Sequence, residues 1–584
     1  MRRDFIIHTL RTAPDSTSRH AYSMSRDAQR PSVCAKSVLV AQGVASPDVA
    51  TMPKAAQPAS FWKSSEAERL WVLAWFIALC VAAIRFTSIS GERTFQYDEW
   101  NFVMNRWQWS ADTFLAPHNS HFSVFPATIF FLLFRIVGLE QYGVYQAVGY
   151  LAHFSVATLL LVALRRRLGD IGALAIAVSV LFLGTGAENS LWPFQIGSMG
   201  SVAGYLIAIV AIESDRPSAP RAVLIGLVLS LGSAGFGVVA VFGVVAETLL
   251  RRQVRRYWWS IAIPVGVWAA WYVLWGTSEM VGSNLTKAPT YVHESLAAAV
   301  AATFRSPLAW GFVFSWLLVV VVVRRVIVSR GHEARLIALS AVLLAFWGLT
   351  AMSRAQYWAP GSNRYVYVAV PLLWLVVAEV VRGLQRQVLI ATSCVLAAWS
   401  LSATWDAMSA HARWLREWSE AVSAELWVVE SRLDIAAKNY RPDPVRAPDI
   451  EAAKFGRAIV ALESSPAMAV ERIATTSSTT RAEVDRVLYE LGAAVLSTSE
   501  SSGLCVAGSE TEQEIALQAG SQSILITTGT SEVGLRAFGD NVIDATRVQA
   551  SGERNLVVTI DQRNPAEQWR LVLLTPGARA CVVG

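Results

Sequence analysis

Two adjacent carboxylates, Asp98 and Glu99, are the residues whose type and position most suggest chemistry. They lie in the run Phe95-Gln-Tyr-Asp-Glu-Trp-Asn-Phe102, a few residues after the first long apolar stretch of the chain. A carboxylate at such a place can act as a general base, hold a metal ion, or remain a solvated loop charge. The elements that would position the pair help to decide among these interpretations.

The composition is typical of a multi-pass membrane protein. Hydrophobic residues make up 54% of the 584 residues and charged residues only 16%, whereas soluble domains carry about 25% charged residues. The 23 tryptophans agree with this class, because Trp collects at membrane–water interfaces. The net charge of +6 does not indicate a nucleic-acid partner, since Lys and Arg form short clusters between apolar runs. The lipid bilayer is therefore an expected partner.

Apolar runs that approach the roughly 20 residues needed to cross a bilayer recur about eleven times in the chain. The loops between them that we assign to the inside are basic, with clusters at Arg165, Arg251, Arg324 and Arg382, as the positive-inside rule requires. This pattern predicts a plasma-membrane protein with a cytoplasmic N-terminus and an extracytoplasmic C-terminus. The expected spans are Leu70–Ile89, Val144–Leu164, Ile171–Gly186, Ser198–Ile212, Ala222–Gly235, Phe236–Leu250, Trp258–Trp275, Leu308–Val323, Leu336–Met352, Tyr365–Val381 and Val388–Ser402.

Two apolar regions of the chain are shorter than a full membrane span. Ala127–Leu139 is short enough to be an interfacial helix, and counting it as a span would place the triple Arg at Arg165 outside. The short pair around Gly235 is expected to form a tight hairpin. The segment Thr277–Ser306 is expected to be an outer loop, in which Glu279 and Glu294 are the acidic residues.

The chain divides into four expected parts. Residues 1–62 are expected to be a disordered cytoplasmic tail, and residues 63–405 form the transmembrane domain, with 91–141 as its first outer loop. Residues 406–502 are expected to be an extracytoplasmic helical region that starts with a helix over Asp406–Ala437. Residues 503–584 form an extracytoplasmic β-rich module, similar to a small β-sandwich.

Cys505 and Cys581 bracket the β-rich module. A disulfide between them is expected in an oxidising compartment. The alternative is a pair of free, buried thiols.

Several short motifs follow the first span. They are Tyr97-Asp98-Glu99, Pro117-His118-Asn-Ser-His121, Pro126 with the apolar run to Gly138, Arg165-Arg-Arg-Leu-Gly169, and the later Asn363-Arg364-Tyr365-Val-Tyr367 with Pro371. Over roughly Trp71–Ser402, these motifs and the order of the spans resemble class C glycosyltransferases, membrane enzymes that use polyprenyl-phosphate sugars as donors. Within that family the likeness is to bacterial protein-mannosyltransferase and aminoarabinose-transferase-like proteins.

The resemblance implies a role for each candidate residue. Transfer from a lipid phosphate needs a base for the acceptor hydroxyl and cations for the leaving phosphate. Asp98 is the best candidate for the base, whereas Glu99 could instead hold a helix or a metal. Arg354 and Arg364, with Tyr365 beside them, are candidates for binding the donor phosphate, because guanidinium groups match phosphate oxygens. The alternative for both arginines is an ordinary snorkelling role at the interface.

Further candidates lie in the other outer loops. His118 and His121 could assist a metal or donate hydrogen bonds to a sugar, or could be ordinary exposed loop residues. Glu188 and Gln195 flank Trp192, and such groups suit sugar hydroxyls and sugar faces, although Glu188 could be a simple loop-end carboxylate. No cofactor is established by the motifs. A divalent metal is left open, since a further acidic motif found in some family members is absent from Thr277–Ser306.

The resemblance implies sugar transfer from a polyprenyl-phosphate donor to an envelope glycan, lipid or protein on the outer face. One alternative is a transporter or flippase for a lipid-linked sugar, which would be expected to show internal repeats and ionisable groups near the bilayer midplane. Another is a non-enzymatic envelope scaffold, which leaves the acid pair at Asp98 unexplained.

Overall fold

The structure is a computed structural model, and it describes residues 66–329, 333–357, 360–499, 503–551 and 554–583. The predicted disordered tail, residues 1–62, lies outside the described residues.

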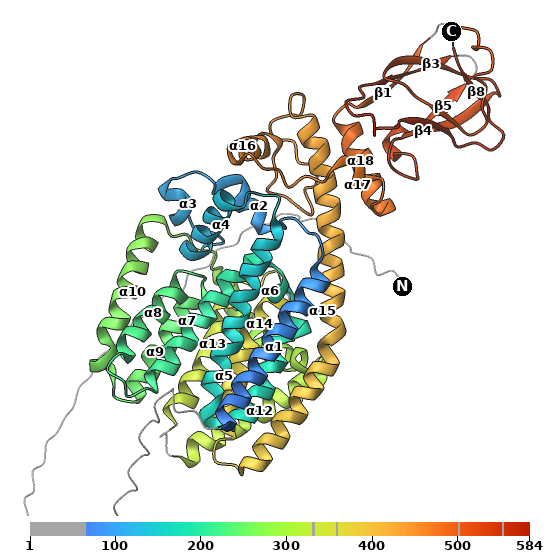
Figure 1. The fold of residues 1–584 in the computed structure, drawn as a ribbon. Coiled ribbons are helices and arrows are strands. Elements are labelled where there is room, and N and C mark those ends of the chain that lie inside the picture. The colour runs from blue at the N-terminus through green and yellow to red at the C-terminus, as the bar shows by residue number, and fades with distance from the viewer. Residues whose placement is uncertain (1–65, 330–332, 358–359, 500–502, 552–553, 584) are drawn as a thin grey trace, which may run out of the picture. The chain divides into compact units, whose positions relative to one another are not determined.

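The helical part is a bundle (Figure 1). Among the described residues, eight helical segments are long and apolar enough to cross a membrane. They lie in α1 (Glu66–Ser90), α5 (Tyr142–Leu181), η2 with α7 (Pro193–Gln195 and Ile196–Ile212), α10 (Val254–Trp275), α12 (Leu308–Val328), α13 (Ala334–Arg354), α14 (Asn363–Val380) and α15 (Arg386–Ser431). Shorter apolar helices are α4 (Val124–Ile136), α8 (Ala219–Leu231) and α9 (Phe236–Leu250).

The helix α5 contains two of the expected spans. At Gly169 the backbone leaves the helical region, with φ 72°, a value that glycine adopts without strain. The chain then turns back, because His153 Nε2 lies 3.0 Å from the carbonyl oxygen of Leu181. With α5 counted as two segments and with α8 and α9 as the short hairpin, a helix lies at each of the eleven stretches expected from the sequence, but α8 and α9 are shorter than the segments that are long enough to cross a membrane.

One expected loop is mostly helical. The segment Thr277–Ser306, expected to be an outer loop, contains η3 (Gly282–Thr286) and α11 (Ala288–Phe304), so the prediction of a loop along its whole length was wrong. Small residues let α11 pack closely on α12, where a Cβ on Gly311 would lie 2.2 Å from the carbonyl oxygen of Ala297. This Ala-rich face carries a weak apolar signal, which is why hydropathy alone misses the helix.

The helix α15 runs through the boundary that we expected at residues 405 and 406. Its 46 residues contain no Gly or Pro, so nothing in the local sequence ends the helix where the apolar part stops. The predicted separate helix at Asp406–Ala437 is therefore the continuation of the last span. The helices α16 (Ala452–Leu462), α17 (Val470–Ile473) and α18 (Ser478–Glu490) follow it.

The β-rich module consists of two antiparallel four-stranded sheets in the described part of the chain, with strand orders β1-β6-β3-β8 and β2-β7-β4-β5. Its strands are β1 (Ala494–Ser499), β2 (Glu514–Ala516), β3 (Gly520–Ile526), β4 (Thr530–Arg536), β5 (Val548–Ser551), β6 (Asn555–Ile560), β7 (Arg570–Leu573) and β8 (Ala580–Val582). The module begins at β1 rather than at residue 503, because β1 pairs with β6 along its whole length.

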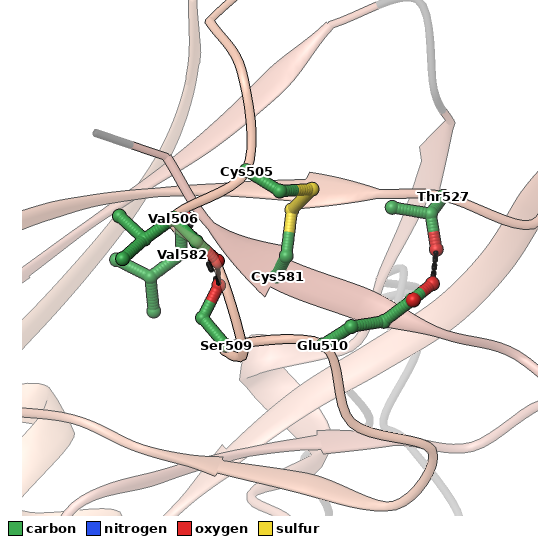
Figure 2. Close-up of a disulfide and its surroundings, with 7 residues drawn as sticks. All are labelled: Cys505, Val506, Ser509, Glu510, Thr527, Cys581 and Val582. Atoms are coloured by element: carbon green, nitrogen blue, oxygen red, sulfur yellow. Dashed lines mark hydrogen bonds between the residues drawn. A yellow bond between two sulfur atoms is a disulfide. The ribbon is translucent and has the colours of Figure 1, made fainter.

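The two cysteines of the module form a disulfide (Figure 2), with Cα atoms 5.6 Å apart. Cys581 is fully buried in β8, and Cys505 lies in the segment that pairs with it. Beside the bridge, Ser509 Oγ donates a hydrogen bond to the carbonyl oxygen of Val506 (2.7 Å). The disulfide therefore ties the segment between β1 and β2 to the last strand of the module.

Candidate active site

The candidate site is built around the start of α2 (Asp98–Asn105), in the loop after α1. Tyr97, the residue before this helix, has φ 42° and ψ −118°, which is strained for a residue with a Cβ. Such a backbone costs on the order of 1–3 kcal/mol and persists only where the surroundings enforce it. Asp98 is the first residue of the helix, where the exposed N–H groups and the helix dipole favour a negative charge.

Asp98 has His118 as its partner. His118 Nε2 lies 3.9 Å from Asp98 Oδ2, and the carboxylate side chain is 30% exposed. Burial acts to raise the pKa of Asp98, but the neighbouring His118, with the charges of Arg364 and Arg354, holds this pKa below its ordinary value. The carboxylate is therefore ionised at neutral pH and reachable from solvent, as a general base must be.

His118 is held by a two-residue turn. Its backbone pairs with that of His121, and the residues between them, Asn119 and Ser120, both have positive φ (48° and 61°), the pattern of a type I′ turn. His121 lies on the far side of the turn, where its ring closely approaches Gly235: a Cβ on Gly235 would lie 2.6 Å from the ring. The turn thus directs His118 to Asp98 and His121 to a neighbouring cavity.

That cavity has a volume of about 280 Å³ and lies between the turn and the helices α9, α10, α13 and α14. Its polar lining includes His121, Glu279, Arg354, Arg364 and Tyr365. Its apolar lining includes Phe236, Val239, Trp268, Phe346 and Leu349. A site that joins two guanidinium groups to an apolar wall suits an anion that carries a hydrocarbon chain.

Each arginine of the cavity is paired with a carboxylate. Arg364 Nε donates to Glu188 Oε1 over 2.9 Å, and Arg354 lies 2.7 Å from Glu279. Arg364 also lies 5.6 Å from the ring centroid of Trp192. Among the described residues, the hydrogen bonds of Arg364 engage only Nε, so its two terminal NH2 groups remain for an anion.

Two of the predicted site residues turn away from this cavity. Glu99 is fully buried and accepts hydrogen bonds from Gln96 N and Tyr142 Oη, both over 2.9 Å. Burial raises its pKa to about 8, so Glu99 fastens α2 to α5, and a catalytic contact with substrate is not supported. Gln195 is also buried, and its Oε1 accepts from Asn189 (3.2 Å) and Ser198 (3.1 Å). Its geometry fits a role in shaping the turn before α7 rather than in binding substrate.

Asp449 is a site residue that the sequence analysis missed. Burial and the charge of Asp98 raise its pKa, against the effects of Asn101 and His118, so it belongs to the same electrostatic site. It lies between a Pro-rich segment and α16, and α16 packs on α2. Nothing in the local sequence marks it, because its neighbours come from the loop after α1, far away in the chain.

The residues of the site do not form a metal centre by themselves. Within the ranges that the structure describes, no three His, Cys, Asp or Glu side chains gather closely enough to hold an ion. The pair Asp98–His118 supplies only two such groups.

Comparison with known proteins gives two solved structures that are similar to this chain. No family model and no curated protein matches it. The apo crystal structure of ArnT from Cupriavidus metallidurans covers 74% of this chain and 93% of its own, at 13% identity and a TM-score of 0.44. The crystal structure of the same protein bound to undecaprenyl phosphate covers 85% of this chain and 98% of its own, at 11% identity and a TM-score of 0.43.

Proposed function

We propose that this chain is an integral membrane glycosyltransferase that moves a sugar from a polyprenyl-phosphate donor to a cell-envelope acceptor on the outer face of the membrane. The observation that carries the proposal is the turn that joins Asp98 to an anion-binding cavity: His118 lies 3.9 Å from the partly exposed Asp98 carboxylate, and its pairing partner His121 lines the cavity together with Arg354 and Arg364. Those arginines line a cavity whose remaining wall is largely apolar. A general base, an anion site and a hydrocarbon site thus occur together.

The donor would bind with its phosphate at the two arginines and its first isoprene units along Phe236, Phe346 and Trp268. Glu188 and Glu279 pair with the two arginines before the phosphate binds. A guanidinium group has five N–H donors. Glu188 can therefore stay hydrogen-bonded to Arg364 Nε while the terminal NH2 groups bind the phosphate. Glu188 is in this way a positioning residue for Arg364.

The transfer step follows from these positions. Asp98 takes the proton of an acceptor hydroxyl, the acceptor oxygen attacks the anomeric carbon, and the bond from that carbon to the phosphate oxygen breaks. The bonding electron pair leaves with the polyprenyl phosphate, whose negative charge Arg354 and Arg364 stabilise. One carboxylate suffices, because the lipid phosphate needs little acid help as a leaving group, and a single displacement inverts the anomeric configuration.

The proposal is tested with the full chain in lipid nanodiscs and a labelled polyprenyl-phosphate-sugar fraction. We expect donor consumption to yield free polyprenyl phosphate, with the sugar on an envelope acceptor or on water. Arg354→Ala and Arg364→Ala should both weaken donor use. If the amount of donor stays unchanged with every envelope fraction offered as acceptor, the proposal is refuted. Movement of intact donor across a vesicle bilayer without cleavage would favour the transporter alternative instead.

A further inference from the structure

An aromatic strip begins at Tyr97, the residue directly before Asp98. The ring centroid of Tyr97 lies 5.9 Å from that of Trp192, 5.0 Å from that of Trp418 and 6.2 Å from that of Trp414. Trp414 and Trp418 are 4.8 Å apart. Both come from the part of α15 that continues beyond the apolar span, at a spacing that places them on one face of the helix.

The strip joins the donor side of the site to the extracytoplasmic region. One end is Trp192, beside Arg364 (5.6 Å). At the other end, Trp418 donates from Nε1 to the carbonyl oxygen of Arg446 (3.3 Å), and the guanidinium of Arg446 lies 5.9 Å from the Trp418 ring. Tyr97 stands between these ends and is bonded directly to Asp98, so a molecule lying on the strip meets the base.

Part of this aromatic surface faces solvent. Trp414 is 37% exposed, and Tyr97 and Trp418 are partly exposed, whereas Trp192 is buried. Exposed indole faces beside charged groups suit a ligand with apolar faces and a polar rim. A sugar ring has this character, because its C–H groups form flat faces and its hydroxyls point outward.

The ends of the strip argue against a lipid acceptor. Ion pairs flank both ends, Arg364–Glu188 on one side and Arg446–Asp443 on the other, the latter with an N–O distance of 2.6 Å. The hydroxyl groups of a sugar can bond to such pairs, whereas an acyl chain lying between them gains no polar contact.

We propose that Tyr97, Trp414 and Trp418 bind the acceptor and that the acceptor is a carbohydrate. This inference rests on the proposed function and adds the acceptor class and its binding surface. The ring of an acceptor sugar packs on the exposed part of Trp414, whose indole also stacks with His411 at 5.3 Å between ring centroids, and one of the sugar hydroxyls is presented to Asp98. The donor binds in the neighbouring cavity, so the two substrates meet at the base.

The test uses the full chain in nanodiscs with the labelled donor fraction and three separate acceptors from the same cells: delipidated envelope polysaccharide, envelope lipid and envelope protein. We expect label in the polysaccharide. Trp414→Ala should raise the KM for the polysaccharide about two- to tenfold, while release of sugar to water without an acceptor stays unchanged. Trp414→Phe should recover most of the loss. Trp399→Ala is the matched control, since Trp399 lies on the same helix, is 44% exposed and stacks on Phe304 in the apolar part.

The outcomes separate this inference from the proposed function. Label in lipid or protein, or an unchanged polysaccharide KM in Trp414→Ala, would overturn the inference while donor turnover still supported the enzyme. If Trp414→Ala reduces the release of sugar to water as much as it reduces transfer, Trp414 acts on the fold or on donor binding. That result would also overturn the inference. If the unaltered chain neither transfers nor hydrolyses the donor, the proposed function falls and the inference with it.

Discussion

Replacing Arg364 by Ala should weaken donor binding far more than it slows chemistry. A hydrogen bond from a charged group contributes about 1.5–3 kcal/mol, and each 1.4 kcal/mol is tenfold in affinity. The donor KM should therefore rise by about 10- to 150-fold. A second effect acts in the same direction, because Glu188, whose side chain is only 17% exposed, loses its partner and repels the phosphate.

This second effect can be measured separately. In the double variant Arg364→Ala with Glu188→Gln, the repulsion is gone, and part of the donor affinity should return. The assay is the initial rate of polyprenyl phosphate release over a range of donor concentrations. Arg305→Ala is the control, since Arg305 is an exposed arginine at the end of α11 and is not part of the cavity.

Two results would refute this reasoning. A fall in kcat at unchanged donor KM in Arg364→Ala would mean that the guanidinium does not bind the ground-state phosphate. A double variant no better than Arg364→Ala alone would mean that Glu188 does not face the donor.

Three further predictions concern pH, redox state and topology. His118→Ala should move the acidic limb of the pH–rate profile upward by about one unit, since a charge at 3.9 Å is worth about 1 kcal/mol in water and 1.36 kcal/mol is one pKa unit. The shift is upward because only the charges of Arg364 and Arg354 then oppose the effect of burial on the pKa of Asp98, and a downward or absent shift would contradict the pairing. Alkylation of exported protein without reductant should leave Cys505 and Cys581 unlabelled by mass spectrometry and label both after reduction; labelling without reductant would rule out the bridge. A reporter that needs export for activity should be active when it is fused after Ser402. A reporter that is active there in the cytoplasm would show that the predicted topology is wrong.

The spans were predictable because length and basic clusters are local properties of the chain. The apolar run before Arg251 ends where α9 ends, and Arg165, which follows the other run, lies four residues before the break at Gly169, so each basic cluster indicates the end of a helical segment without any knowledge of its neighbours. The same local reasoning failed for α11, whose Ala-rich face buries itself through close backbone approach rather than through hydropathy. It also failed at residue 405, where the change from apolar to polar was taken for a break although no Gly or Pro ends α15.

The site was predictable in its residue types and only partly in its geometry. Asp98, His118, Arg354, Arg364 and Glu188 were selected from separate loops, and the structure brings them together. Whether a side chain faces a cavity or the core depends on tertiary contacts, however.

Three residues illustrate this limit. Glu99 follows Asp98 directly, yet the first turn of α2 directs it into the core toward Tyr142. Asp449 and Trp414 reach the site only because the continuation of α15 and α16 bring distant sequence beside α2, which no local pattern records.

The central claim is that Asp98 is the base of a sugar transfer, and Asp98→Asn tests it most directly. The variant keeps the shape of the side chain but cannot accept the acceptor proton, so transfer should fall by about 10²–10⁴-fold, with the donor KM changed little. Asp112→Asn, an exposed carboxylate in the same loop, is the control and should behave like the unaltered chain. Near-normal transfer by Asp98→Asn, particularly if Glu188→Gln abolishes transfer instead, would contradict the account.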